Sequence, residues 1–177
     1  MQSNSMLQKR AVSTRTITTT AVLTAIIFIM TFLPRIPIPL GYAHLGDAVI
    51  FMTVLFAGRR ESAVAASAGS ALSDLIGGFP IWIVPTLIIK WIMVESVFAV
   101  IRPERGTWRI LSLRTIAAFL LSAVWMVFSY TVAGGILYGS MAASTAMIPG
   151  LIGEGVINIA VALAAGAALQ KFNFHKI

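Results

Sequence analysis

Six apolar stretches, separated by short polar or basic segments, dominate this sequence of 177 residues. Each stretch is close to the roughly 20 residues that an α-helix needs to cross a bilayer. Helices are expected because the bilayer core offers no partner for unpaired backbone groups, and the alternation typical of a membrane β-barrel is absent. The sequence therefore predicts an all-α membrane protein with one domain, residues 1–177, and six transmembrane helices, at about 17–33, 40–57, 62–78, 80–101, 115–138 and 145–169.

Composition excludes the main alternatives to a membrane protein. Hydrophobic residues make up 58% of the chain and charged residues 11%, less than half of the roughly 25% typical of soluble domains. A soluble domain of this length could not bury so much apolar surface. The chain has no cysteine, which excludes a secreted disulfide scaffold. The scarcity of charge excludes disorder.

The basic residues predict how the helices are oriented. Cytoplasmic loops of membrane proteins are enriched in Lys and Arg. With six spans, Arg35 alone falls on one side, and Lys90 lies within a span. Both termini are therefore expected in the cytoplasm, including the basic segment 1–16. The opposite side from Arg35 holds Lys9, Arg10, Arg15, Arg59, Arg60, Arg102, Arg105, Arg109, Arg114, Lys171 and Lys176. Because these residues form short clusters between apolar stretches, the net charge of +7 does not indicate nucleic-acid binding.

Two connecting segments have distinct compositions. Residues 33–41 contain three prolines, which fix φ and remove donors, so a stiff extended segment is expected over the outer end of the bundle. The longest inner loop, 102–114, is basic and contains Trp108. It fits an anchor at the lipid headgroups or a docking surface for a cytoplasmic partner, and its composition favours the anchor.

Ionisable side chains inside the predicted spans point to a functional site, because such groups are costly in a membrane. Asp47 and Asp74 lie near the outer ends of their spans, whereas Lys90 and Glu154 lie deeper. At 1.5 Å per residue, Lys90, Glu154 and Tyr130 lie roughly 12–15 Å below the outer ends of their helices. This distribution predicts a polar pocket that opens outward.

Helical spacing groups further residues with these charges. Thr86 shares a face with Lys90, and Asn158 shares a face with Glu154, since each pair is four residues apart. Glu95 is about 140° around the helix from Lys90 and is expected to face elsewhere. Flat side chains for stacking on an aromatic ligand are also available. They are Trp82, Trp125 and Tyr130.

A structural reading of the same charges remains open. Lys90 can pair with Glu154 or an aspartate solely to neutralise buried charge. His44, just before Asp47, fits an interfacial position, and no spacing of His or carboxylate residues predicts a metal site.

Small residues predict close helix packing. Ala21 and Ala25 are four residues apart in the first span, an arrangement that suits either packing within the bundle or contact with another protein. In the third span, small side chains cover two faces, as expected of a central helix. These faces comprise Ala66, Ser70 and Asp74, and Ala63, Ser67 and Ala71.

Motifs typical of enzymes are missing. The sequence contains no Walker A loop, no Gly-x-Ser-x-Gly and no His-Glu-x-x-His, so neither ATP hydrolysis nor a bound cofactor is expected. A proton-coupled carrier that uses Asp47, Asp74 or Glu154 remains an alternative. A membrane enzyme that uses carboxylates of the third and sixth spans is a further one.

One run of sequence is similar to a known family. It comprises His44-Leu45-Gly46-Asp47-Ala48-Val49-Ile50-Phe51, then Gly69 to Gly78, Pro80-Ile81-Trp82, and Thr86 to Lys90. With the chain length and the six spans, this run resembles the substrate-binding S components of energy-coupling factor (ECF) vitamin transporters. The branch that it resembles is assigned to hydroxymethylpyrimidine or vitamin B6.

The resemblance implies a function that composition cannot show. An S component in a prokaryotic cell membrane binds a vitamin, joins a membrane coupling protein (T component) and two ATPases, and topples to deliver the vitamin inward. Ala21 and Ala25 would meet the coupling protein. Lys90, Tyr130, Glu154, Asn158 and the proline-rich loop would form the site, with Asp47, Asp74, Thr86, His44, Trp82 and Trp125 as further candidates. Pyridoxine or hydroxymethylpyrimidine is the expected ligand, with riboflavin an alternative and pantothenate kept open by Lys90.

Overall fold

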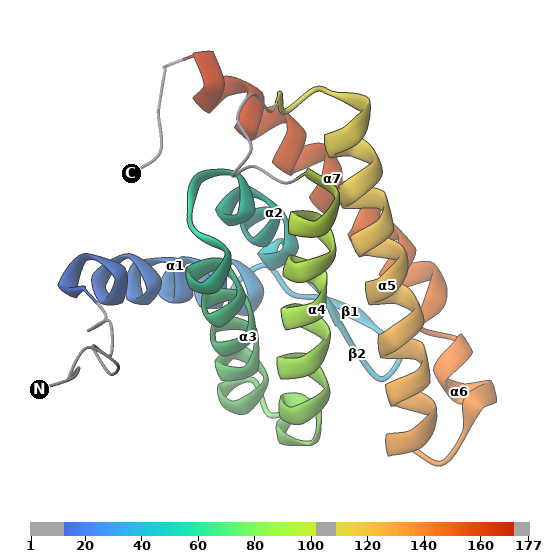
Figure 1. Cartoon of the computed structure of the whole chain (residues 1–177). Coiled ribbons are helices and arrows are strands. Elements are labelled where there is room, and N and C mark those ends of the chain that lie inside the picture. The colour runs from blue at the N-terminus through green and yellow to red at the C-terminus, as the bar shows by residue number, and fades with distance from the viewer. Residues whose placement is uncertain (1–12, 102–108, 172–177) are drawn as a thin grey trace, which may run out of the picture.

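Long apolar helices form the body of the protein in the computed structural model, which describes residues 13–101 and 109–171 (Figure 1). Helices α3, α4 and α5 run side by side, α7 packs against α5, and α1 lies across the flank of α3 (Figure 1). The helices are α1 (Thr14–Phe32), α2 (Gly46–Phe56), α3 (Arg59–Ile76), α4 (Ile83–Ile101), α5 (Leu113–Leu137), α6 (Met141–Thr145) and α7 (Ile148–Lys171), with a 3-10 turn at Pro80–Trp82.

In the part of the chain that the structure describes, four stretches of helix are long and apolar enough to cross a membrane. They are Thr14–Phe32, Pro80–Ile101, Leu113–Leu137 and Met141–Lys171. Helix α3 has 18 residues but is built from small and polar side chains. Helix α2 has 11 residues and is therefore roughly 16 Å long, too short to span a bilayer. The all-α membrane class is confirmed, while six spans and cytoplasmic termini remain predictions.

The second predicted span, 40–57, begins too early. Residues 40–45 are not helical, because the proline-rich segment continues into a β-hairpin of β1 (Ile36–Ile38) and β2 (Gly41–Ala43). Proline has no N–H to donate to a helical hydrogen bond, and it pushes the residue before it toward extended backbone. The expectation of an extended segment at 33–41 is confirmed in part, because Ile36–Ile38 is extended whereas residues 39–40 form a turn. Its turn is strained, since Leu40 has φ 60°, a conformation rare for a bulky side chain.

Several other helix boundaries differ from the predicted ones by a few residues. The first and fifth helices begin early, at Thr14 and Leu113, because the Ser13 and Ser112 side chains accept backbone N–H bonds from the first turn. The sixth predicted span, 145–169, is divided between α6 and α7.

Helix α3 is central, as its small residues predict. Its small and polar side chains are buried against α1 and α4, including Ala63, Ala66 and Ser67. At Gly69, an added Cβ would lie 2.7 Å from the carbonyl oxygen of Thr24 in α1. Only glycine permits this approach of the two backbones.

Three helix termini lie toward one end of the molecule: the end of α4, the start of α5 and the end of α7 (Figure 1). Away from the centre of the bundle, Glu95 forms an ion pair with Arg59, as expected for a side chain that does not share the face of Lys90. Most of the predicted inner loop, including Trp108, and most of the basic segment 1–16 lie outside the described residues.

Candidate functional site: a polar cavity lined by aromatic rings

A small cavity with about 50 Å³ of free interior lies between the hairpin and the helices of the bundle. The lining residues come from α1, the hairpin, α3, α4, α5 and α7 and from the short segments that join them. They are Thr31, Ile38, Leu40, Gly41, Tyr42, His44, Ser70, Asp74, Phe79, Trp82, Thr86, Tyr130, Met147, Leu151 and Glu154.

Four aromatic rings contribute to this lining in two pairs. The ring centroids of Tyr42 and Phe79 are 5.2 Å apart, and those of Trp82 and Tyr130 are 5.6 Å apart. Both pairs are tilted, the arrangement that aromatic side chains favour. Such walls suit a flat ring.

Asp74 is the acidic group on the α3 side of the cavity. Its Oδ1 accepts a hydrogen bond of 3.1 Å from the Tyr42 hydroxyl, and Ser73 Oγ lies 3.2 Å from the same hydroxyl. Burial raises the pKa of Tyr42 to about 12, so this hydroxyl stays a donor at neutral pH. The Arg35 guanidinium stacks 4.5 Å from the Tyr42 ring and donates to the Ser73 carbonyl.

Within residues 13–101 and 109–171, three buried polar atoms at the cavity have no hydrogen-bond partner. They are Thr31 Oγ1, Ser70 Oγ and Asp74 Oδ2. Most buried polar groups in proteins are paired, and leaving one unpaired costs about 1–3 kcal/mol. Their position around one cavity indicates a place for a polar ligand or ordered water.

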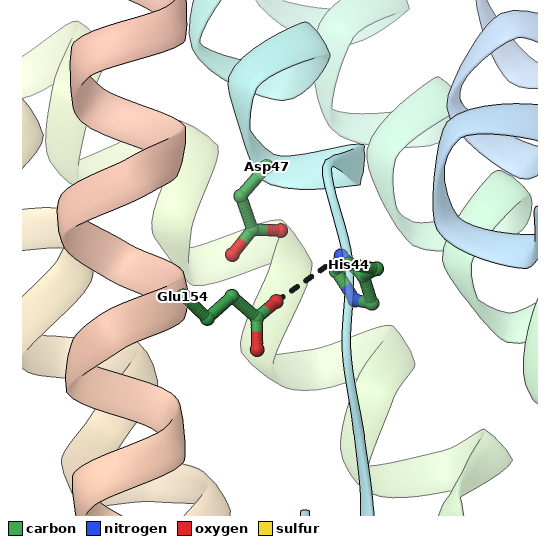
Figure 2. Close-up of side chains that lie close together, drawn as sticks. All are labelled: His44, Asp47 and Glu154. Carbon is green, nitrogen blue, oxygen red and sulfur yellow. Dashed lines mark ion pairs between the residues drawn. The ribbon is translucent and has the colours of Figure 1, made fainter. Parts of the chain in front are cut away.

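On the α7 side, three potential ligand groups converge. The side chains of His44, Asp47 and Glu154 approach one another from the segment before α2, from α2 and from α7 (Figure 2). Their ligand atoms lie within 4.8 Å of one another, and His44 Nδ1 is 3.1 Å from Glu154 Oε1. Burial, and then the positive charge of Lys90, lower the pKa of His44 to about 4.

This cluster has the donor types of a metal site, although the sequence spacing predicted none. The spacing was uninformative because Glu154 is far from the other two residues along the chain. The Lys90 ammonium, however, lies 2.5 Å from Asp47 Oδ1. Its positive charge repels a divalent cation at the same carboxylate.

The structure brings six of the predicted ligand residues to the cavity and leaves four outside its lining. Those at the cavity are His44, Asp74, Thr86, Trp82, Tyr130 and Glu154. Lys90 and Asp47 instead pair with each other, each side chain 1% exposed. This is the charge-neutralising arrangement that the sequence left open.

Asn158 and Trp125, also outside the lining, make structural hydrogen bonds. The Asn158 Oδ1 accepts from the backbone N–H of Ala48, while its Nδ2 donates to the carbonyls of His44 and Glu154. Asn158 therefore holds α7 against the start of α2. The Trp125 indole donates to the Ile89 carbonyl at 3.2 Å, which links α5 to α4.

Sequence reasoning missed Tyr42, which lines the cavity beside Asp74. Tyr42 and His44 are two residues apart, the spacing that puts side chains on one face of a strand. The helix predicted from residue 40 conceals this strand-like spacing. Leu151 was also missed, although it lies three residues before Glu154, on the same helical face.

Ala21 and Ala25 lie on the exposed side of α1. The neighbouring Thr24 and Ile27 face α3 instead. The alanine pair therefore belongs to a surface that the bundle itself leaves uncovered.

A second hollow lies between α5 and α7. Its lining is apolar apart from Thr131, and includes Val124, Phe128 and Val156. It offers almost no polar group to orient a vitamin, so the polar cavity is the candidate site.

One family model matches most of the chain. Residues 11–171 match the family model described as "ECF-type riboflavin transporter, S component". A solved structure, the S component of a bacterial ECF transporter, superposes with a TM-score of 0.69 at 19% identity, covering 89% of this chain and 96% of that one. This likeness shows the fold. An uncharacterised protein of Pyrococcus woesei is 42% identical over 64 residues, which are 35% of this chain and 43% of that protein. The chain thus matches less than half of that relative.

Proposed function

Because the chain belongs to the family of ECF-type riboflavin transporter S components, we propose that it binds a vitamin with a single aromatic ring, pyridoxine or hydroxymethylpyrimidine. A member of this family is a multi-pass protein of the prokaryotic cell membrane. It supplies the substrate site of an ECF transporter and is not itself an enzyme. The proposal adds the class of vitamin and the residues that hold it.

The observation that supports this choice is the combination of aromatic walls with unpaired polar atoms in one cavity. Tyr42, Phe79, Trp82 and Tyr130 offer surfaces for a flat ring. Hydroxymethyl groups can donate to Asp74 Oδ2 and exchange hydrogen bonds with the free hydroxyls around it. A vitamin with one ring and several small polar substituents meets both requirements.

The proposed roles divide the ten candidate ligand residues into two groups. Asp74, Thr86, Trp82, Tyr130, His44 and Glu154 would contact the vitamin, because they line the cavity. Asp47, Lys90, Asn158 and Trp125 would hold the surrounding helices in place.

The charge arrangement argues against pantothenate. Lys90 was the reason to consider this carboxylate, but its ammonium already pairs with Asp47. Among the described residues, no Lys or Arg lines the cavity. Riboflavin is the second candidate, favoured by the description of the matching family, and it requires room for three fused rings.

For transport, the proposal includes a coupling protein of the T type and two ATPase subunits. The exposed alanine pair, Ala21 and Ala25, offers a surface on which a partner helix can approach closely. The alternative is a carrier that works alone on the proton gradient.

Uptake of labelled vitamins separates these alternatives. The chain is expressed in cells that lack their own uptake, with or without a coupling protein and ATPases. The proposal predicts accumulation of pyridoxine or hydroxymethylpyrimidine only with the active ATPases. Accumulation by the chain alone that a protonophore abolishes would identify a proton-coupled carrier instead. Accumulation of riboflavin alone would replace the proposed vitamin by the second candidate.

A further inference from the structure

Among the described residues, two carboxyl groups at the cavity, Asp74 and Glu154, form no ion pair with a Lys or Arg. Asp47 is paired with Lys90, and Arg35 stacks on the tyrosine that donates to Asp74. Glu154 has a side chain that is 3% exposed and forms its polar contact with His44. In the described part of the chain, no Lys or Arg forms an ion pair with Glu154.

The hydrogen bonds around His44 indicate where a proton lies between His44 and Glu154. The backbone N–H of Gly46 donates to His44 Nδ1 at 3.2 Å, so this nitrogen presents its lone pair and carries no hydrogen. Glu154 Oε1 lies 3.1 Å from the same nitrogen. Two bare acceptors would repel each other in a buried site. The contact is attractive when Glu154 is the neutral acid and its O–H shares the single lone pair of Nδ1 with the Gly46 N–H.

The backbone fixes this arrangement. An added Cβ at Gly46 would lie 2.0 Å from Thr31 Oγ1, so glycine is required where the Gly46 N–H approaches His44. The carbonyl of His44 is in turn held by Asn158. The imidazole is thus oriented from both sides of the segment that precedes α2.

We propose that Glu154 recognises a basic ring nitrogen of the vitamin and gives it the proton that it now shares with His44. The inference rests on the proposed function, because it concerns the same cavity. The O–H bond of Glu154 breaks, its electron pair stays on the carboxylate, and an N–H bond forms on the ring. The product is a buried pair of a ring cation and a carboxylate, and the hydrogen bond from Glu154 to His44 Nδ1 is lost, so the Glu154 carboxylate must turn from that nitrogen toward the ring N–H. A neutral base therefore binds without exchanging a proton with solvent.

The other ionisable groups near Glu154 already have contacts of their own, so the proton exchange involves only Glu154 and His44. Asp47 of α2 lies within 4.8 Å, but Lys90 of α4 neutralises it. Asp74 of α3 and Tyr42 of the hairpin form their own hydrogen bond. Tyr130 of α5 donates to Thr86 at 3.1 Å. Of these groups only Lys90 is positively charged, and its ammonium is in direct contact with Asp47 rather than with Glu154.

The exchange defines the chemical class of the ligand. Pyridine and aminopyrimidine rings carry a basic nitrogen and qualify. The weakly basic ring nitrogens of riboflavin do not, and pantothenate has no ring. A ring with a permanent positive charge can also bind, but only if the proton of Glu154 leaves to solvent.

Calorimetry on the purified full-length chain tests this proton balance. Pyridoxine and hydroxymethylpyrimidine are each titrated with two analogues, one N-methylated at the ring nitrogen and one with C–H in its place. Each titration is repeated at neutral pH in two buffers of different ionisation heat. The parent vitamin is expected to show no net proton change, and the N-methyl cation to release one proton per ligand. The C–H analogue should bind at least about 10-fold more weakly, since a hydrogen bond to a charged group is lost.

Two amide variants locate the effect. Glu154→Gln cannot release a proton, so it should lose the N-methyl cation and weaken binding of the parent vitamin at least about 10-fold. Glu95→Gln is the matched control, because Glu95 pairs with Arg59 away from the cavity. If Glu154→Gln does not fold, the number of protons that the unmodified chain releases on binding the N-methyl cation still tests the exchange.

The contrary outcomes are distinct. Equal affinity for the C–H analogue, or binding of the N-methyl cation without proton release, would overturn the exchange and leave the proposed function standing. Vitamin binding that a chelator abolishes would overturn it in favour of a metal at the His44 cluster. Failure to bind either vitamin would overturn both the exchange and the proposed function.

Discussion

Lys90 Nζ lies 2.5 Å from Asp47 Oδ1, with both side chains 1% exposed. The pair joins α4 to the first turn of α2, where the carboxylate also suits the helix N-terminus. Neither residue lines the cavity. The one lysine within the predicted spans is therefore neutralised by the protein itself, and its charge is not available to an anionic vitamin.

Removal of one member of this pair should destabilise the protein more than removal of both. Lys90→Met or Asp47→Leu leaves a partner unsatisfied in a buried site, which costs roughly 3–5 kcal/mol where a charge remains. The double variant Lys90→Met/Asp47→Leu should recover most of that loss. Thermal unfolding in detergent measures all three. Losses that simply add would contradict the pairing.

Asn158 should prove to be a structural residue rather than a vitamin contact. Asn158→Asp keeps an acceptor for the Ala48 N–H but turns the other oxygen toward the carbonyls of His44 and Glu154, which lie 2.7 and 2.8 Å from Nδ2. The expected loss is about 1–3 kcal/mol in the free energy of unfolding. Chemical unfolding in detergent measures it. A stable Asn158→Asp with weakened vitamin binding would move Asn158 into the site.

His44 should make stability depend on acidic pH. Its pKa is lowered to about 4 from the usual 6.5, so between these values the unfolded chain binds a proton that the folded protein does not. The free energy of unfolding should therefore fall as pH is lowered from 6.5 toward 4. His44→Asn should flatten this dependence, as measured by unfolding at several pH values. The matched change His175→Gln, outside the described residues, should leave it intact. The same slope in both variants would assign the effect to another group.

The alanine pair of α1 should affect transport without affecting binding. Ala21→Trp and Ala25→Trp place bulk on an exposed surface, so vitamin affinity should stay unchanged while uptake with the ATPases falls to background. Val124→Trp, on an exposed part of α5, is the control for a bulky lipid-facing side chain. Unchanged uptake in both alanine variants would refute a docking role for α1.

The sequence predicted the helices well where the apolar pattern was long, as in α4 and α5. It failed at the start of α2, because the hairpin and the segment before the helix still contain apolar residues such as Leu40, Ala43 and Leu45. Hydropathy cannot distinguish a short buried strand from the first turn of a helix. The strained turn at Leu40 carried no signal, since a leucine with positive φ is rare.

The site was predicted in part for a similar reason. The predicted depths of Tyr130 and Glu154 along their helices agree with their position in one cavity. The depth of a residue along its helix does not show which carboxylate pairs with a lysine. The sequence predicts that Lys90 contacts the ligand, whereas in the structure its ammonium pairs with Asp47. The approach of His44 to Glu154 depends on how α7 packs against the start of α2, which one sequence alone does not specify.

Direct vitamin binding by the isolated chain is the central claim, and Trp82 in the cavity wall provides a signal for it. Native mass spectrometry of the detergent-purified chain, followed by tryptophan-fluorescence titration, is the most direct test. The expected result is a copurified pyridoxine or hydroxymethylpyrimidine, or high-affinity quenching by one of them that Trp82→Phe largely removes. No bound vitamin and no response to pyridoxine, hydroxymethylpyrimidine, riboflavin or pantothenate would contradict the account.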